Sequence, residues 1–442
     1  MKKRVPLPER TLTIEALSHE GRGIAHEEGK VVFVDGALPG EVVRAAWVRR
    51  QRRFDEARVV EVLQASPDRV EAPCAWAGVC GGCSLQHMSN EAQLRYKQEA
   101  LAEQLRHFGA SEPRQWLPAL RDTTLGYRRK ARLGVRYVLK KERLLVGFRE
   151  KHSNFLVDMQ DCPVLDQRLA SRLPQLREML ESLQIRQHMA QIEFAAGDEE
   201  VALIFRHLLP LPDTDRQRLI EFCREQGWVA YGQAEGPQSV CRLTESGPGP
   251  DDRLHYALPA ADLRMAFHPG DFTQVHAGIN RRMIALALDL LDIQPEHSVL
   301  DLFCGLGNFT LPLARRAHEV IGVEGSVEMT ERAAENARAH GLRNVSFYAE
   351  DLQQELHTSA WAGRHFDRIL IDPPRSGAEA VVRHMSSWGA ERIVYVSCNP
   401  ATLARDAGLL AEQGYVLHTA GVMDMFPHTA HVESIAVFVR GK

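Results

Sequence analysis

The chain has 442 residues, of which 44% are hydrophobic and 25% charged, and its formal net charge is −4. This balance is typical of a folded globular protein of two to four domains and argues against a mainly disordered chain. The sequence has no run of about 18 uncharged apolar residues, so we expect no membrane-spanning helix. The first six residues lead into no apolar segment, so we expect no signal peptide and a cytoplasmic location.

The first predicted domain, residues 1–66, consists of short β-rich runs separated by turns. Asp-Gly at 35–36 and Pro-Gly at 39–40 are turn dipeptides. The pattern predicts a small barrel of five strands. A loop of four arginines and a glutamine at 49–53 is its most basic feature.

The second predicted domain, residues 67–270, begins after a Ser-Pro-Asp boundary. Between about 121 and 268, β-rich runs alternate irregularly with helical stretches, which predicts an α+β domain. The β-rich runs are 131–138, 144–148, 192–195 and 201–205, and the helical stretches are 167–183 and 213–226.

The third predicted domain, residues 271–442, has a regular alternation of strands and helices. This rhythm predicts a parallel, doubly wound sheet. Its predicted strands are 298–303, 320–324, 345–348, 368–371 and 393–396.

Charge is unevenly distributed along the chain. Residues 121–151 hold eleven Lys and Arg against three Asp and Glu, a local charge of +8. Such a window can mark a surface for a polyanion, since cations bind phosphates. A face that is simply solvated is the alternative.

A strand that leads into a glycine-containing loop and a helix lies at 299–316. Its glycines let backbone N–H groups approach a ligand, as at nucleotide sites of open α/β sheets. Glu324 ends the next strand, 23 residues after Asp301, where a carboxylate can accept hydrogen bonds from ribose hydroxyls. Asp351 closes the third strand and can accept from an adenine amino group. The arrangement resembles the S-adenosylmethionine-dependent methyltransferases; an unrelated βα turn and a NAD-binding sheet are the alternatives.

Three later motifs lie where ligands bind in such sheets: DPPRSG at 372–377, SCNP at 397–400 and HVES at 431–434. The cysteine of the second motif, Cys398, is a nucleophile if its thiolate is stabilised, and a helix N-terminus after it would help. A buried, inert thiol is the alternative.

Together these motifs resemble the RNA uracil-5-methyltransferase family, which carries its nucleophile in S-C-N-P and its base in H-x-E-S. The resemblance implies that Cys398 is the nucleophile and Glu433 the general base. It also assigns an S-adenosylmethionine site to six residues: Gln274, Phe303, Asn308, Glu324, Asp351 and Asp372.

The implied chemistry explains why a thiol and a carboxylate are needed. Uracil C5 is too weak a nucleophile to take a methyl group directly, and addition of a thiolate at C6 turns the ring into an enolate. A base then removes the C5 proton, and the thiol leaves. RNA cytosine-5 methyltransferases resemble this chain in the sheet that binds the cofactor, but they typically carry Pro-Cys after the fourth strand. Here Arg375 follows the prolines, which favours uracil over cytosine and over amino groups.

Three cysteines cluster at Cys74, Cys80 and Cys83, and a fourth thiol is available at Cys162. Four thiolates suit zinc or a [4Fe–4S] cluster. The segment resembles the cluster region of the ribosomal RNA uracil-5-methyltransferases, which implies that these four residues hold a [4Fe–4S] cluster. Zinc and the absence of any metal are the alternatives.

The expected fold class is therefore an α/β methyltransferase with a Rossmann-like doubly wound sheet. An N-terminal OB-like barrel, similar to the TRAM domain, and a central α+β domain with the iron–sulfur cluster precede it. This combination most resembles the branch that methylates 23S ribosomal RNA, so we expect that RNA as the partner and a monomeric enzyme. A dual-site ribosomal or transfer RNA enzyme, or a non-catalytic RNA-binding protein, is the alternative; intact Cys398 and Glu433 argue against the last.

Overall fold

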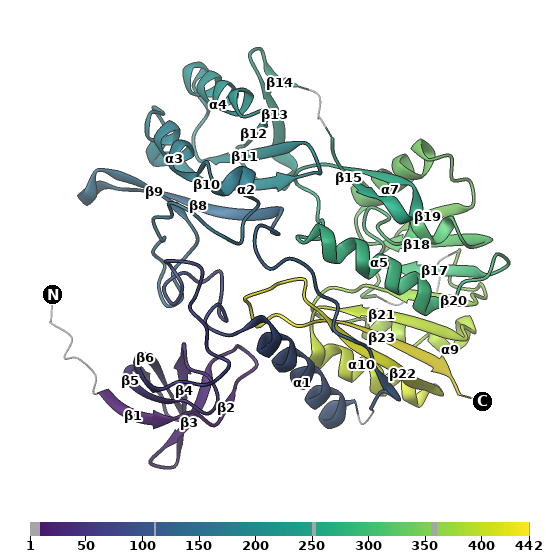
Figure 1. The fold of residues 1–442 in the computed structure, drawn as a ribbon. Coiled ribbons are helices and arrows are strands. Elements are labelled where there is room, and N and C mark those ends of the chain that lie inside the picture. Colours follow the sequence, from purple (N-terminus) through teal and green to yellow (C-terminus); the bar gives the residue numbers. More distant parts are fainter. Residues whose placement is uncertain (1–8, 110–111, 250–252, 355–359, 442) are drawn as a thin grey trace.

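The computed structural model describes residues 9–109, 112–249, 253–354 and 360–441. Figure 1 shows the arrangement of their elements: a small N-terminal sheet, a central sheet with helices on one side, and a C-terminal sheet covered on both faces. In these described ranges no helix is long and apolar enough to cross a membrane.

The N-terminal domain is a six-stranded sheet with the order β1-β5-β6-β4-β3-β2. Its small core includes the buried side chains of Leu12, Val32, Val34, Val43 and Trp47. Five strands were expected; the sixth is the two-residue β2, which pairs with β3. The strands are β1 (Glu9–Thr13), β2 (Ala16–Leu17), β3 (Gly23–Glu27), β4 (Lys30–Asp35), β5 (Val42–Arg50) and β6 (Phe54–Gln64).

Two elements that precede the central sheet in the chain pack instead on the C-terminal domain. These are α1 (Asn90–Phe108) and β7 (Gln115–Trp116). The α1 side chains of Leu101 and Leu105 join the hydrophobic core of the C-terminal sheet. Strand β7 adds to that sheet by parallel pairing with β22 (Tyr415–Met423). The Ser89 hydroxyl caps α1 by accepting the Ala92 N–H at 3.3 Å. The chain therefore touches the C-terminal domain before it enters the central one.

The central domain is a seven-stranded sheet with the order β14-β13-β12-β11-β10-β8-β9. Its apolar face packs on helices through Leu133, Phe194, Leu203, Leu176 and Leu219. Its strands are β8 (Lys130–Val138), β9 (Arg143–Gly147), β10 (Met189–Ala196), β11 (Val201–His207), β12 (Val229–Gln233), β13 (Val240–Thr244) and β14 (Gly247–Gly249). Its helices are α2 (Gln167–Ala170), α3 (Leu173–Glu181) and α4 (Asp213–Glu225), with 3-10 turns at Leu139–Lys141, Arg186–His188 and Pro237–Ser239.

A hairpin of β15 (Leu254–Leu258) and β16 (Leu263–Phe267), joined by the turn Pro259–Ala261, follows the central sheet. Asn336 of α7 (Val327–Ala339) holds it by two hydrogen bonds to the backbone of Ala266, at 2.8 and 3.0 Å. The hairpin core residues Met265 and Phe267 pack in the same cluster as the C-terminal sheet.

The C-terminal domain is an eight-stranded sheet with the order β19-β18-β17-β20-β21-β23-β22-β7. Strands β17 to β21 are parallel, as the alternating pattern predicts, and β23 pairs antiparallel to β21 and β22. Apolar side chains fill both faces of the sheet, which is why its strands read as continuous runs. Its strands are β17 (Ser298–Leu302), β18 (Glu319–Glu324), β19 (Val345–Ala349), β20 (Arg368–Ile371), β21 (Arg392–Ser397), β22 (Tyr415–Met423) and β23 (Glu433–Arg440). Its helices are α5 (Ala277–Leu291), α6 (Thr310–Ala314), α7 (Val327–Ala339), α8 (Glu379–Val382), α9 (Met385–Trp388) and α10 (Pro400–Glu412).

Candidate active site

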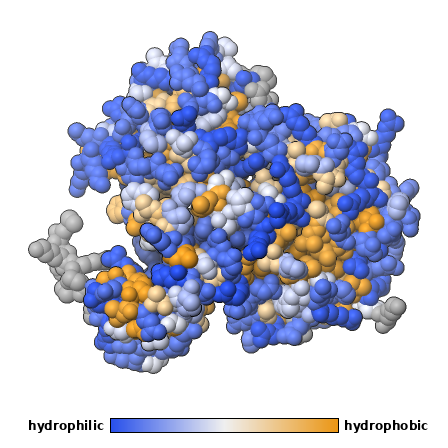
Figure 2. Space-filling view, in the orientation of Figure 1, coloured by the Kyte–Doolittle hydropathy of each residue, from blue (hydrophilic) through white to orange (hydrophobic). Residues whose placement is uncertain are grey.

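A cavity of about 1200 Å³ lies between the C-terminal domain and the central sheet. Ligand sites of open α/β sheets lie beyond the carboxyl ends of the strands, and the loops after β17, β18, β20 and β21 line this cavity. The structure brings all eight expected catalytic and cofactor residues to its wall: Gln274, Phe303, Asn308, Glu324, Asp351, Asp372, Cys398 and Glu433. In Figure 2 hydrophilic side chains cover most of the central domain, and hydrophobic ones gather over the C-terminal side.

The loop after β17 has three residues with positive φ, of which the sequence predicts only the two glycines. Phe303 has a φ of 64°, and Gly305 and Gly307 have φ values of 57° and 89°. A Cβ on Gly307 would lie 2.4 Å from Cδ1 of Leu311, and the left-handed φ of this residue disfavours any side chain, so both favour glycine. The left-handed phenylalanine is costly for a bulky residue, which is typical of strained turns at functional sites.

Two acidic side chains hold this loop by hydrogen bonds. Asp301 is fully buried and accepts the Thr310 hydroxyl at 2.5 Å, and burial raises its pKa to about 8. Glu324 ends β18 and accepts the N–H groups of Gly305 and Ser326, both at 3.1 Å. Glu324 thus orders the loop and also lines the cavity, where its carboxylate can accept further bonds from a ligand.

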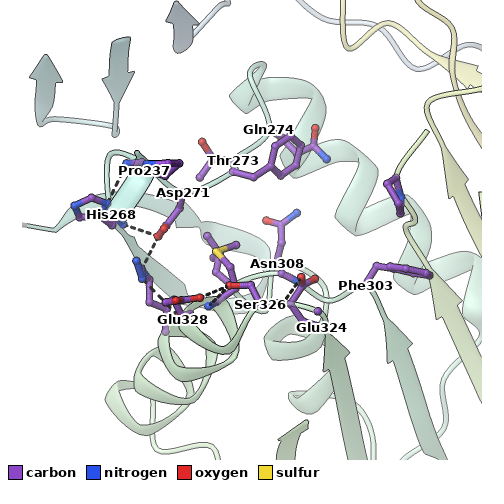
Figure 3. A pocket seen from close by; sticks show the side chains of 18 of the residues that line it. Pro237, His268, Asp271, Thr273, Gln274, Phe303, Asn308, Glu324, Ser326 and Glu328 are labelled. Atoms are coloured by element: carbon purple, nitrogen blue, oxygen red, sulfur yellow. Dashed lines mark hydrogen bonds and ion pairs between the residues drawn. The ribbon is translucent and has the colours of Figure 1, made fainter. Parts of the chain in front are cut away.

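Gln274 lies in the segment before α5 and Asn308 in the loop after β17, and both appear with Glu324 around one space in Figure 3. The Asn308 amide is fixed by two partners that motif analysis missed: it accepts the Tyr256 hydroxyl at 2.8 Å and exchanges hydrogen bonds with Asn280 at 2.9 and 3.2 Å. Both partners lie outside any recognisable motif, so no sequence signal marks them.

Asp351 and Asp372 extend the acidic lining of the cavity. Asp351 follows β19 and accepts the N–H of Gln353 at 3.0 Å and the side-chain amide of Gln354 at 2.8 Å. Asp372 follows β20, and burial together with the charge of Glu324 raises its pKa to about 7. The part of the cavity beside Glu324, Asp351 and Asp372 is acidic and favours a cationic ligand.

Cys398 and Glu433 are adjacent because of strand pairing between β21 and β23. Ser397 pairs with Ser434 in the antiparallel register, so the residue after one strand lies beside the residue that opens the other. Burial, and then the charges of Glu433 and Asp372, raise the pKa of the Cys398 thiol to about 11. Burial, and then Asp372, raise the pKa of Glu433 to about 8. The expected thiolate stabilisation by the helix end is thus outweighed by burial and by the neighbouring carboxylates.

Arg375 supplies positive charge to this pair. Its charge acts to lower the pKa values of both Cys398 and Glu433. Its backbone carbonyl accepts the Asn399 side-chain amide at 3.0 Å, and its guanidinium lies 3.3 Å from Nδ1 of His431. In the sequence Arg375 stood out only because it replaces a cysteine or an aromatic residue. The structure places it beside Cys398 and Glu433.

The loop that precedes Glu433 is held by side chains of α1. Lys97 is fully buried and its ammonium lies 2.7 Å from Oδ1 of Asp424 and 3.0 Å from the Phe426 carbonyl. Gln93 accepts the N–H of His428 at 2.7 Å. The sequence signal for this contact is the position of Lys97 among the buried residues of α1, which the motifs did not indicate.

Part of the basic window of 121–151 has a structural use. Burial lowers the pKa of Lys130 to about 8, and its ammonium binds the carbonyls of Pro269 and Asp271 in the loop that leads to Gln274. Arg129 pairs with Asp198, which also takes Arg281 at 2.8 Å. These cations hold domains together and are not all free for phosphates.

The expected iron–sulfur cluster is wrong, and with it that part of the expected fold class. Cys74, Cys80, Cys83 and Cys162 interact electrostatically, but among the described residues no group of three or more His, Cys, Asp or Glu side chains is arranged to hold a metal ion. Cys162 packs in the central core with Cys80 and Cys83 against it. Burial raises the pKa of Cys83 to about 12 and that of Cys162 to about 11, so these groups are neutral thiols. The spacing predicted proximity but not ligand geometry.

The fold and the cavity define a methyltransferase built on a doubly wound sheet. The family model for tRNA (Uracil-5-)-methyltransferase matches residues 89–441, and that for the TRAM domain matches residues 8–60. The chain belongs to the tRNA (Uracil-5-)-methyltransferase family.

Full-length relatives and a solved structure agree with this assignment. The chain is 54% identical to the 23S rRNA (uracil(1939)-C(5))-methyltransferase RlmD of Alcanivorax borkumensis, over 100% of this chain and 99% of the relative. It is 51% identical to the protein of that name from Hahella chejuensis, over 99% of each. The tRNA (uracil-54, C5)-methyltransferase of Pyrococcus abyssi, solved with S-adenosyl-L-homocysteine, has the same fold: 24% identity, TM-score 0.74, 97% of this chain and 100% of that one.

Proposed function

We propose that the protein transfers a methyl group from S-adenosylmethionine to C5 of a uridine in 23S ribosomal RNA. The observation that carries the proposal is the pairing of Ser397 with Ser434, which sets Cys398 beside Glu433 in the cavity that is also lined by the six residues expected to bind the cofactor. The names of the full-length relatives support 23S RNA and the uridine at position 1939. A transfer RNA substrate is the second candidate, supported by the name of the family model.

The lining of the cavity fits the proposed cofactor. Gln274, Phe303, Asn308, Glu324, Asp351 and Asp372 would hold S-adenosylmethionine. Carboxylates at the ends of β18 and β19 accept hydrogen bonds from ribose hydroxyls and an adenine amino group, and the acidic lining suits a sulfonium cation. When bound, the cofactor supplies an electrophilic methyl group.

Cys398 would act as the nucleophile at C6 of the uracil ring. Its thiol must first lose a proton, because its pKa of about 11 lies well above neutral pH. Addition at C6 would form a carbon–sulfur bond and move the electrons of the C5–C6 double bond to C5 and O4, so that C5 can take the methyl group and S-adenosylhomocysteine is left. Arg375 would offset the negative charge that develops beside it.

Glu433 would then remove the C5 proton and allow the thiolate to leave. Its carboxylate is buried, so it is shielded from bulk water and can accept a proton near neutral pH. The target base has to leave its stack to reach these groups, as in other enzymes that modify bases. The proton moves from C5 to Glu433, and the electrons of the C6–sulfur bond return to Cys398.

RNA would be held across the domains, with the barrel and the exposed cations of the central domain contacting phosphates. We expect a monomer that works in the cytoplasm. The test is methyl transfer from labelled S-adenosylmethionine to 23S transcript and to transfer RNA. Label in 23S RNA alone, lost when uridine 1939 is replaced by cytidine, is the expected result; label in transfer RNA alone would overturn the choice of substrate.

A further inference from the structure

One face of the central sheet is left open by its helices and lines the same cavity as the reacting groups. Side chains alternate along β8: Ala131 and Leu133 are buried toward the helices, whereas Arg132 is exposed on the opposite face. Arg132, Gln191, Glu193 and Arg206 all lie in the wall of the cavity that contains Cys398. At about 1200 Å³ the cavity exceeds the usual 300–1000 Å³ of a site for one small ligand, so it has room for more than the cofactor.

Glu193 lies at the centre of this open face. In the sheet register it is opposite Arg132 on β8 and Ile204 on β11, and Arg206 is opposite its neighbour Gln191. The Glu193 side chain is 15% exposed. Its Oε1 atom accepts the Gln191 side-chain amide at 2.9 Å and lies 3.0 Å from the guanidinium of Arg132.

Both of these contacts go to Oε1, and neither uses the second carboxylate oxygen, Oε2. The carboxylate is therefore oriented by two neighbours and keeps an acceptor for a ligand. An ionised carboxylate only accepts hydrogen bonds, so its partner must be a donor. It also repels a phosphate, whereas the exposed guanidinium groups of Arg132 and Arg206 on either side attract one.

We propose that Glu193 is a base-recognition subsite for a nucleotide next to the target uridine, and that it selects a base with an exocyclic amino group. Adenine, cytosine and guanine offer such a group, and uracil does not; a carboxylate that accepts from a base amino group is a known mode of direct readout. Arg132 and Arg206 hold the phosphates of the same strand. This inference rests on the proposed function, because it requires that RNA enter the cavity.

The test removes single amino groups from the RNA. Within three nucleotides of the target uridine, purine riboside replaces adenosine, inosine replaces guanosine, and the ribonucleoside of pyrimidin-2-one replaces cytidine. The kcat/KM for methylation of each RNA is measured with the wild-type enzyme, with Glu193→Ala and with the control Glu225→Ala. Glu225 is exposed on α4, which covers the opposite face of the same sheet.

At one position, loss of the amino group should lower kcat/KM of the wild type and of Glu225→Ala by about 5- to 20-fold. Glu193→Ala should show a similar loss with unmodified RNA and no further loss with the modified one. Binding of S-adenosylmethionine should be equal in all three proteins, which shows that Glu193→Ala is folded.

The subsite would be overturned if, at every position, Glu193→Ala and loss of the amino group lowered kcat/KM independently, so that their effects multiplied. It would also be overturned if Glu193→Ala had the same activity as the control Glu225→Ala. In either case Arg132 and Glu193 would be an ordinary ion pair of the sheet surface. Failure of the proposed function is a separate outcome, because the wild type would then not methylate the unmodified RNA.

Discussion

The ammonium group of Lys97 lies 2.7 Å from the carboxylate of Asp424, and the two buried residues are 327 positions apart in the chain. Lys97 is on α1, which precedes the central domain, and Asp424 starts the loop that leads to Glu433. The contact ties the first third of the chain to the loop that positions the proposed base.

Lys97→Met should lower the free energy of unfolding by about 3–5 kcal/mol, because it leaves the Asp424 charge buried without its partner. The double variant Lys97→Met/Asp424→Leu should recover most of this loss, since an apolar pair leaves no charge uncompensated. Urea unfolding of the two variants and the wild type measures the difference. Equal stability of Lys97→Met and the wild type would show that the buried pair contributes nothing.

The same double variant should change the pH dependence of proton release from C5. Asp372, Arg375, Lys97 and Cys398 are the charged or titratable groups that act on Glu433 or are acted on by it. As the proposed base, Glu433 would have to be ionised, so release should rise as pH increases through about 8, the pKa of this carboxyl. Lys97 lowers that pKa, so its removal should move the rise to higher pH.

Tritium release from C5-labelled uridine, followed from pH 6 to 10, measures this effect. Formation of the covalent adduct should shift less, because Lys97 is not among the main influences on Cys398. A profile of the double variant that coincides with the wild-type profile would refute an electrostatic action of Lys97 on Glu433.

Gly307→Ala should weaken S-adenosylmethionine binding at least about tenfold, because a Cβ would meet Leu311 at 2.4 Å and the φ of 89° disfavours any side chain. The matched control is Gly414→Ala. Gly414 has a φ of 85° after α10, but a Cβ there would meet nothing within 4 Å. Calorimetric titration separates the two: similar affinity in both variants would mean that the loop tolerates the added methyl group.

Two arginines of the basic window should respond differently to removal. Arg136 is exposed on β8, whereas Arg129 is paired with Asp198. Arg136→Ala should weaken the binding of all RNA sequences to the same degree. The slope of log affinity against log salt concentration should become less steep by about 0.7, for one lost single-strand phosphate contact. Arg129→Ala should mainly lower stability. RNA affinity measured against salt concentration tests this, and an unchanged slope in Arg136→Ala would mark that side chain as simply solvated.

Much of the C-terminal domain could be predicted from sequence because its information is local. Strands buried on both faces read as apolar runs, and Phe303, Gly305 and Glu324 mark loop positions that any such sheet brings together. The eight expected residues therefore reach one cavity.

What could not be predicted depends on contacts between distant segments. Tyr256 and Asn280 fix Asn308 through hydrogen bonds that no motif encodes, and Lys97 reaches Asp424 only because α1 packs on the C-terminal domain. The cysteines show the converse error. Their spacing can be seen in the sequence, but metal ligation requires thiolates that converge on one point. Among the described residues no such group is found, and burial raises the pKa of Cys83 and Cys162.

The central claim is that Cys398 and Glu433 act in sequence on one uracil ring, and trapping of the covalent intermediate tests it most directly. With 23S transcript and S-adenosylmethionine, Glu433→Gln should form a protein–RNA adduct that survives a denaturing gel, because C5 keeps its proton and the thiol cannot leave. Cys398→Ala should bind RNA and form no adduct. An adduct that persists in Glu433→Gln after Cys398 is also replaced by alanine would contradict the assignment of the nucleophile.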